Sequence, residues 1–503
     1  MSLLKQSEKL NRRVGEPQAY LLIRSLAAKN FEILNWPSKK MESWKYSPVQ
    51  KLQTEFTPQI DEKNSEKSSK DFILTFESLN IEIKNYLNSI TNTHFESIII
   101  YNGRIVESTK LDHPIDKNSK INEDSLFELL TLKNALEKGI IDSLSLKNDD
   151  NKLEALNLSY FDQGYLLYIN ENTKLNKPIH LIHIYSSPEE KPLFQSRLQI
   201  MASKGSQASI LETHAIFNIS FQTTATSIVS PAPLSPSKDP IITQTSESEL
   251  TAAKAPTSTS TPTTTTTIQN STSTFTPWNN STTFIKIDDE ARLNYIQWNE
   301  IPSNHQITHR THVTLKNKTH FHFLQGSTSD GWMRNELSVN PEGSDSEILL
   351  HGIGLSKKTG IIDQPSKINF SGPNNQCQQI FKNLLLGQSR AIFNGQIKIQ
   401  PSAQKTNSSQ LHQSLLLSTE AEVDTKPELE IYADDVKATH GAAIGQLNED
   451  ELFYFQSRGI SKNRAHTLVC LGFLSELCDH LTNTEIQTYL KSRIKEFWMK
   501  DIQ

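Results

Sequence analysis

The residues best suited to chemistry lie near the C-terminal end of the sequence, within residues 427–460. Thr439, His440 and Gly441 follow a strand-like run there, in a predicted turn that leads into a helix capped by Asn448. An imidazole at such a junction can bind a metal ion or accept a proton, because its pKa lies near neutrality. A helix-capping or interface histidine without a chemical task is the alternative, and the residues alone leave both open.

Three cysteines bound the possible sulfur and metal chemistry. Cys470 and Cys478 stand in a predicted apolar helix, so we interpret them as core residues. Cys377 is interpreted as a small buried hydrophobic residue, with sulfur chemistry as the alternative. Three scattered cysteines without a CxxC pair exclude a disulfide framework and a tetrathiolate metal site within one chain, and they favour a reducing cytoplasm.

The densest group of histidines lies in the middle of the chain, and two adjacent carboxylates, Asp434 and Asp435, precede His440. Alternate residues of a strand share a face, so two of these histidines would project together, but a metal site would also need carboxylates or thiolates from other segments. The two carboxylates would point to opposite faces of a strand and make a poor acid/base pair. The histidines of this group are His305, His309, His312, His320 and His322.

The elements that must position these residues fall into three parts. Residues 1–155 are predicted to be mainly helical, residues 156–440 consist of short β-branched runs separated by turn residues, and residues 441–503 are predicted to be helical again. Many short strands without crossover helices indicate a sandwich, a barrel or a β-solenoid. The number of strands and their irregular spacing favour a solenoid, in which each coil packs only on its neighbours.

Residues 222–282 interrupt the β region with a stretch rich in Ser, Thr and Pro and poor in large apolar residues. Such a segment buries too little surface to offset the entropy of ordering the chain, so we predict a disordered insertion. A neutral insertion at a coil corner is favoured, because lengthening a surface loop costs little free energy. A tether or a modified segment is the alternative.

Two local patterns in the N-terminal part predict specific geometry. A helix there is expected to supply an apolar face of Leu22, Leu26 and Ile33, with Tyr20, Ala27 and Leu34 beside them. Asn102–Gly103, between two strand-like runs, predicts the turn of a β-hairpin.

Composition argues against several classes of function. A formal charge of −5 over 503 residues argues against a broad electrostatic surface for nucleic acid or anionic membrane. No apolar run approaches the roughly 20 residues of a membrane helix, and the start of the sequence lacks the apolar core of a secretory signal. There is no GxxxxGK[ST] phosphate loop, so nucleotide hydrolysis is not expected of this chain.

Residues 427–460 closely resemble the end of the core in SufB/SufD-type iron–sulfur cluster assembly proteins, and the SufD branch in particular. The similarity continues upstream through residues 390–437. The segment ESWKYSPVQKL, residues 42–52, is similar to the family's N-terminal Trp-(Lys/Arg)-Tyr motif. The resemblance covers both ends and most of the β region but not the Ser/Thr/Pro-rich insertion.

The resemblance implies a right-handed parallel β-helix flanked by helical N- and C-terminal regions. It also implies a complex in which the chain pairs with a SufB-type paralogue, and each of the two binds a SufC-type ATPase through its C-terminal helices. A cysteine desulfurase or sulfur carrier and an iron source feed this complex, and a transient Fe–S cluster forms where the paralogues meet. Flavin is associated with the family at the level of the complex, and no residue of this chain is assigned to it.

Thr439, His440 and Gly441 match the family's Cys-(Ser/Thr)-His-Gly motif, whose histidine faces a SufB cysteine across the interface. Ala438 departs from it, because the family usually has cysteine at that position. A methyl group neither coordinates iron nor carries a persulfide. We therefore expect His440 to be the ligand or proton acceptor on this side, with SufB supplying the thiolates.

Two further residues are candidates for a sulfur or iron route. His412 falls near the place where SufB-type sequences carry a cysteine, and a surface histidine is its default interpretation. Cys377 lies in a corner of the β region that often carries cysteine in this family.

Three classes of function compete. The resemblance indicates a non-catalytic scaffold subunit in the cytoplasm, whose partner ATPase hydrolyses ATP. β-Solenoids also host polysaccharide lyases and hydrolases, which are commonly exported, and turnover of a uronic-acid polymer would support that class. An adhesin-like surface protein is suggested only by the Ser/Thr/Pro-rich stretch, and recovery from a membrane or secreted fraction would favour it.

Overall fold

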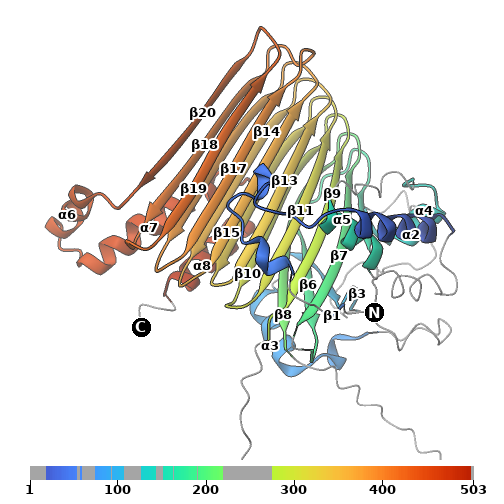
Figure 1. The fold of residues 1–503 in the computed structure, drawn as a ribbon, viewed down its shortest axis with the longest axis horizontal. Helices are drawn as coiled ribbons and strands as arrows, with labels where there is room; N and C mark the ends of the chain where they lie inside the picture. The colour runs from blue at the N-terminus through green and yellow to red at the C-terminus, as the bar shows by residue number, and fades with distance from the viewer. Residues whose placement is uncertain are drawn as a thin grey trace, which may run out of the picture. The chain divides into compact units, whose positions relative to one another are not determined.

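The chain winds through two sheets in alternation and forms a β-solenoid (Figure 1). Successive strand pairs run from β5 (Tyr165–Ile169) and β6 (Ile179–Ser186) to β19 (Glu422–Ile431) and β20 (Lys437–Gly445), which makes about eight coils. The predicted fold class, mainly β with a solenoid core, is confirmed. The computed structural model describes residues 18–53, 57–58, 74–91, 93–106, 126–142, 151–161, 164–189, 191–218 and 275–499.

Both sheets are ten-stranded, and all contacts between coils are parallel. The first contains, in spatial order, β19, β17 (Arg390–Ile399), β15 (Ile361–Phe370), β13 (Trp332–Pro341), β11 (Gln306–Leu315), β9 (Trp278–Ile287), β7 (Pro192–Ala202), β5 and the antiparallel β4 (Phe127–Thr131), with β1 (Thr57–Pro58) paired to β7. The second contains β20, β18 (Asn407–Leu416), β16 (Gln376–Leu385), β14 (Glu347–Ser356), β12 (His320–Ser329), β10 (Arg292–Ile301), β8 (Gln207–Phe217), β6, β2 (Glu96–Tyr101) and the antiparallel β3 (Arg104–Ile105).

One corner of the solenoid repeats the same turn in successive coils. Each turn places one residue in the left-handed region, at Gly205, Glu290, Lys318, Asp345, Asn374 and Lys405. The residue that follows is small or medium-sized and buried in every case: Ser206, Ala291, Thr319, Ser346, Asn375 and Thr406. Most left-handed positions here are not glycine, so the repeat lies in the backbone conformation and leaves little trace in the sequence.

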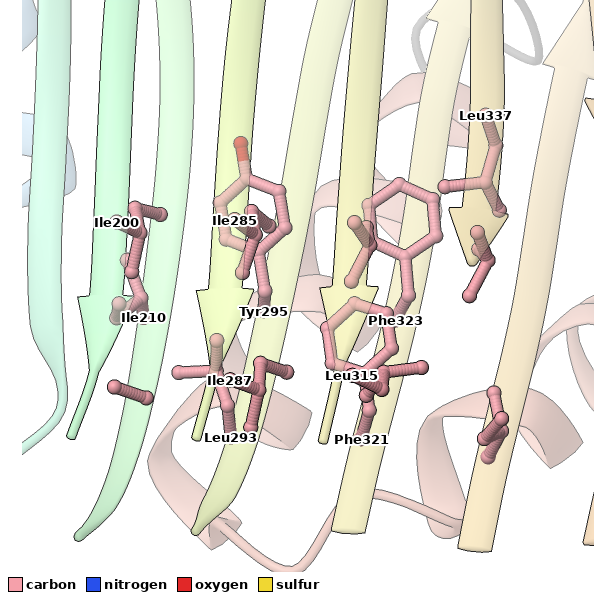
Figure 2. Packing of buried hydrophobic residues seen from close by; sticks show 14 of the residues in the cluster. Ile200, Ile210, Ile285, Ile287, Leu293, Tyr295, Leu315, Phe321, Phe323 and Leu337 are labelled. Carbon is pink, nitrogen blue, oxygen red and sulfur yellow. The ribbon is translucent and has the colours of Figure 1, made fainter. Parts of the chain in front are cut away.

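The interior of the solenoid beside this corner is apolar. Strands turn alternate side chains inward, and Figure 2 shows Ile285, Ile287, Leu293 and Phe321 stacked between the sheets. Burying one such side chain stabilises the fold by roughly 1.5–3 kcal/mol, so these rows are the main source of cohesion between coils. Farther from the corner the inward rows become polar, with the buried residues Gln297, Asn299, Gln325, Ser327, Asn335, Gln364, Gln379, Asn383 and Gln410.

The N-terminal part packs helices against the first coils and also adds strands to both sheets. Helix α2 is present as predicted, and its predicted apolar face is partly right: Tyr20 and Ala27 are buried, but Leu26 is exposed. Leu22 and Ile33 are 70% and 78% exposed, whereas Ile23 and Phe31 are buried. The physical reason is that α2 packs along α5, which selects the adjacent stripe of the helix. The helices are α2 (Gln18–Ile33), α3 (Ile81–Ile90), α4 (Leu132–Glu137) and α5 (Lys152–Tyr160), with the 3-10 turns η1 (Glu42–Trp44), η2 (Val49–Gln53) and η4 (Phe76–Ser78).

The hairpin predicted at Asn102–Gly103 is confirmed. Both residues have positive φ, 45° and 80°, and they join β2 to β3. Two predicted boundaries shift: the solenoid continues through β20 beyond residue 440, and β9 begins at Trp278, inside the predicted insertion. The remainder of that insertion, up to residue 274, lies outside the described residues.

The C-terminal part consists of α6 (Glu449–Ser457), α7 (Lys462–Asp479) and α8 (Thr484–Met499). The side chain of Asn448 caps α6, as predicted, by accepting a hydrogen bond from the Asp450 amide at 2.9 Å. Helices α7 and α8 pack on the outer face of the second sheet, where Leu474 and Ile486 join a cluster with Trp298. None of the helices in the described part of the chain is both long and apolar enough to cross a membrane.

Candidate functional site

The last coil of the solenoid, β19 and β20 with the turn between them, is called the end coil below. β19 pairs only with β17 and β20 only with β18, so among the described residues nothing covers their outer edges (Figure 1). An uncovered edge presents a row of free backbone donors and acceptors. Ile431, Tyr432 and Ile444 add exposed apolar surface there, at 45%, 56% and 47%. The end coil is therefore suited to bind another chain.

His440 lies within β20 and not in the predicted turn, which instead occupies residues 432–436. It is paired in register with Gln410 of β18, which in turn pairs with Gln379 of β16. The Gln410 amide donates a hydrogen bond to the Gln379 side chain at 2.7 Å, and both residues are buried. His440 thus continues an inward-facing polar row, yet it is exposed because no further coil follows.

Space for this row comes partly from Gly395 on the facing strand β17. A Cβ at that position would overlap the amide of Gln410. Gly441, in contrast, is not required by packing, because a Cβ there would only reach ordinary contact with Leu411 at 3.5 Å. Thr439 is exposed and belongs to the opposite row of β20. Of the three predicted motif residues, only His440 is on the row that continues the interior.

Ala438 packs at the margin of the solenoid core, in register with Ser408 and, one coil further, Cys377. Cys377 is buried, and burial raises the pKa of its thiol to about 12. Cys470 and Cys478 are also buried, as predicted, and burial raises the pKa of each to about 12. All three thiols are therefore protonated near neutral pH, and none of them is exposed at the surface.

His412 is fully buried, so its predicted surface position is wrong. Its ring stacks on Phe393 at 4.7 Å between centroids, and its Nε2 lies 3.0 Å from the Asn383 amide nitrogen. Burial lowers the pKa of His412 to about 4, so the ring is neutral at physiological pH. The inward row of β18 places it one coil below Ala442, beneath the end coil.

The dense histidine group does not form one site. His309 points into the interior near Ser281, with 2.5 Å between Oγ and Nδ1, whereas His312 contacts Glu154 on the outer face at 2.6 Å. His322 lies 2.9 Å from His351, and His320 lies 2.9 Å from Glu347. Asp434 and Asp435 are exposed in the turn of the end coil and do not lie on a strand, so the predicted opposite-face arrangement is wrong. The interpretation of these residues as structural is consistent with this scatter.

The Trp-Lys-Tyr segment is held on the first sheet by a buried ion pair. Arg334 donates to Asp363 at 2.7 Å and to Ser47 at 2.9 Å, and its guanidinium carbon lies 3.6 Å from the centre of the Trp44 ring. Burial raises the pKa of Asp363, although Arg334 opposes this effect. The motif residues therefore anchor the N-terminal segment to the solenoid and are remote from His440 in sequence and sheet.

One cluster of potential metal ligands escaped the sequence analysis: His183, Glu212 and His214, called the buried triad below. The only signal was the spacing Glu-x-His in β8, which places both side chains on one face of a strand. His183 joins them from β6 through strand register, which no pattern in the sequence determines.

Two protein-family models match this chain, one over its N-terminal part and one over most of the solenoid. Residues 253–473 match the family model described as SUF system FeS cluster assembly, SufBD core domain, and residues 10–181 match the SufBD protein N-terminal region. The two matches together cover well over half of the chain.

Individual proteins of the same family are also similar to this chain. The chain is 33% identical over 221 residues to the chloroplastic protein ABCI7 of Arabidopsis thaliana, covering 43% of this chain and 46% of the relative. It is 30% identical over 213 residues to the iron–sulfur cluster assembly protein SufD of Escherichia coli, covering 42% and 50%. The matched part thus spans about half the length of these two relatives. A SufBD family protein of Synechocystis is 25% identical over 459 residues, which is 91% of this chain and 86% of the relative. The chain therefore belongs to the SufBD family of the SUF iron–sulfur cluster assembly system, as a SufD-type member.

Proposed function

We propose that this protein is a non-catalytic scaffold subunit of a cytoplasmic SUF assembly complex. It pairs with a SufB-type paralogue through the end coil, docks a SufC-type ATPase through its C-terminal helices, and supports new cluster assembly and iron acquisition. The single observation that carries this proposal is the position of His440: an exposed imidazole on an inward-facing row, at an uncovered end of the solenoid.

The chemistry assigned to His440 follows from the ligands that the chain lacks on that surface. Ala438 offers no thiol, and Cys377 is buried and protonated. A cluster bound there as cargo would take thiolates from the paralogue and one imidazole from this chain. Mixed His and Cys ligation is established for iron–sulfur clusters and raises their potential relative to all-Cys ligation. Sulfur from a desulfurase or carrier would reach the complex through the paralogue.

Pairing with a paralogue is supported by the edges of β19 and β20. Two strand edges that lack partners can extend into the sheets of a second solenoid, and the exposed Ile431, Tyr432 and Ile444 would be covered in the process. Such an interface would enclose His440 without moving it, because the ring already lies on the row that a further coil would cover.

Docking of the ATPase is supported by exposed apolar residues on helices that the solenoid leaves uncovered. In α6, only Leu452 is buried, whereas Phe453 and Tyr454 are 71% and 57% exposed. Leu468 of α7 adds 42% exposure. A cluster of exposed large apolar side chains is typical of a protein interaction surface. Hydrolysis belongs to the partner, because this sequence has no phosphate loop.

Co-expression of the chain with a SufB-type and a SufC-type protein tests the two surfaces separately. Ile444→Asp is expected to abolish co-purification with the paralogue while the ATPase remains bound. Phe453→Asp is expected to have the opposite effect. Glu171→Ala, in the exposed turn after β5 and outside both surfaces, serves as the control for surface substitutions. Loss of both partners, or of neither, in the two Asp variants would contradict the proposed division of surfaces.

A further inference from the structure

The buried triad combines three metal-ligating groups inside the solenoid, in the coils nearest the N-terminal part. His183 and His214 lie directly opposite each other in the parallel strands β6 and β8, and Glu212 precedes His214 by two residues on the same face. All three are at most 4% exposed. Their ligand atoms lie within 4.8 Å of one another.

The distances within the triad fit the coordination of a small divalent ion. His183 Nε2 and His214 Nε2 lie 3.2 and 3.1 Å from the same oxygen of Glu212, Oε1. Ligands at about 2.0–2.1 Å from an ion are separated by about 2.9 Å at octahedral angles and by about 3.4 Å at tetrahedral angles. The observed separations fall between these values. The two imidazole rings are stacked, with centroids 4.6 Å apart and planes 6° from parallel, so one ring has to turn about its side-chain torsions for both nitrogens to point at a single ion.

The hydrogen bonds of the triad are incomplete without a further group. Of the two Nε2 atoms, that of His214 has hydrogen-bonding geometry to Glu212, whereas that of His183 does not. Nearby, Nε2 of His309 is buried without a hydrogen-bond partner among the described residues, and so is Oδ1 of Asn279. Buried polar atoms of this kind are costly unless an ion or a water satisfies them.

The surroundings of the triad support a metal-bound state of its ligands. Nδ1 of His214 lies 3.2 Å from the side-chain nitrogen of Asn279. Rotating that amide by half a turn would make Oδ1 the acceptor of an Nδ1–H and leave Nε2 free to coordinate. The hydroxyl of Tyr295 donates to the second oxygen of Glu212. In Figure 2 this hydroxyl points away from the apolar rows around Leu293 and Phe321.

The charge of the buried Glu212 carboxylate is a further argument for a bound metal ion. Glu212 is buried, and the titratable groups in contact with it are the imidazoles of His183 and His214 and the hydroxyl of Tyr295. Within the described residues, no Lys or Arg side chain forms an ion pair with it. A buried carboxylate flanked by two imidazoles and a tyrosine therefore lacks a permanent cation, which a divalent metal would supply.

We propose that His183, Glu212 and His214 bind one divalent transition-metal ion of the Fe²⁺ or Zn²⁺ class, with His309 or a water in the remaining position. Two imidazoles and one carboxylate suit both of these ions, and harder ions such as Mg²⁺ prefer oxygen ligands. The site is independent of the end coil and of the proposed function. Its burial between coils makes it a resident ion that ties β6 to β8.

The test uses the full chain, expressed without a metal-binding tag and purified without oxygen. Metal analysis after washing with a chelator is expected to find about one equivalent of iron or zinc per chain, and it identifies which. Protein stripped of metal under mild denaturation and refolded with Co²⁺ is expected to show visible absorption bands and a higher melting temperature than the metal-free form.

Two variants connect the metal to the triad. Tyr295→Phe keeps the core filled and removes only the hydrogen bond to Glu212, so it is expected to weaken metal binding by about 10–100-fold. Glu212→Gln removes a ligand and is expected to have a larger effect. His180→Asn is the matched control, because His180 lies in β6 on the opposite face and contacts Thr213. It is expected to retain the metal.

Two results would overturn the proposal. The first is wild-type protein that retains no metal and shows no Co²⁺ spectrum after refolding with the ion. The second is a Tyr295→Phe protein that folds and binds metal as tightly as wild type, which would place the metal elsewhere. Neither result would affect the end coil, since cluster assembly with the paralogue is measured separately.

Discussion

Replacing His440 by alanine separates a chemical role of this residue from a structural one. The ring is exposed, and no described residue forms a hydrogen bond with it, so little native structure depends on it. Surface substitutions of this kind change the free energy of unfolding by about 0.5 kcal/mol or less. The melting temperature and the co-purification of both partners are therefore expected to match those of the wild type.

Cluster assembly is expected to respond very differently. If His440 is a ligand from this side, its loss should lower the affinity for the nascent cluster by at least about tenfold. Removing a residue that only hydrogen-bonds to a metal ligand already weakens metal binding by about 10–100-fold. The assay is the visible absorbance of clusters formed on the purified complex with sulfide source, iron and ATP. His440→Cys restores a soft ligand and should recover much of the yield.

The control for this experiment is Lys437→Ala, which lies on the same strand but on the opposite, outward row. It should leave the cluster yield unchanged. A His440→Ala complex that assembles clusters as well as the wild type would remove His440 from the mechanism. A yield that falls equally in both variants would show that the strand edge, and not the imidazole, is required.

Three further predictions concern the solenoid itself. Arg334→Ala leaves Asp363 buried without its main cation, so the free energy of unfolding is expected to fall by about 3–5 kcal/mol in urea denaturation; a loss below 1 kcal/mol would contradict the role given to this pair. Burial lowers the pKa of His180, His309 and His412 to about 3, 3 and 4, so these residues stay neutral in the native state while the unfolded chain binds protons below about pH 6.5. Stability is therefore full above that pH and should fall by up to about 1.4 kcal/mol per pH unit for each histidine as the pH drops from about 6.5 to 4; a stability that stays level over this range would refute the assignment of neutral rings. Cys377, Cys470 and Cys478 are buried with raised pKa values, so native protein should resist alkylation near neutral pH and react fully only in denaturant, as mass spectrometry would show.

Some features of this protein could be predicted because they depend on local chemistry. The hairpin at Asn102–Gly103 follows from the need for positive φ at both turn residues, and the cap at Asn448 follows from a side chain that accepts an amide hydrogen bond. The solenoid class followed from many short strands without crossover helices. His440 was identified through its neighbours in a motif, which is also local information.

Other features depend on which strand lies beside which, and these could not be predicted. His412 was expected at the surface, but the register of β18 turns it inward against Phe393. The apolar stripe of α2 was only partly correct, because contact with α5 buries Tyr20 and Ala27 but leaves Leu22 exposed. The buried triad needs β6 and β8 to align so that His183 meets His214, and nothing in either strand alone determines that alignment.

By itself, the sequence determined the family, the solenoid class and the histidine at its end, because each depends on residue types in a short window. Only the tertiary structure decided that the end coil is uncovered, that His440 continues an inward row, and that two histidines and a glutamate converge in the interior. The physical reason is that parallel strands about 30 residues apart make contact through register, and register depends on the summed packing of all coils.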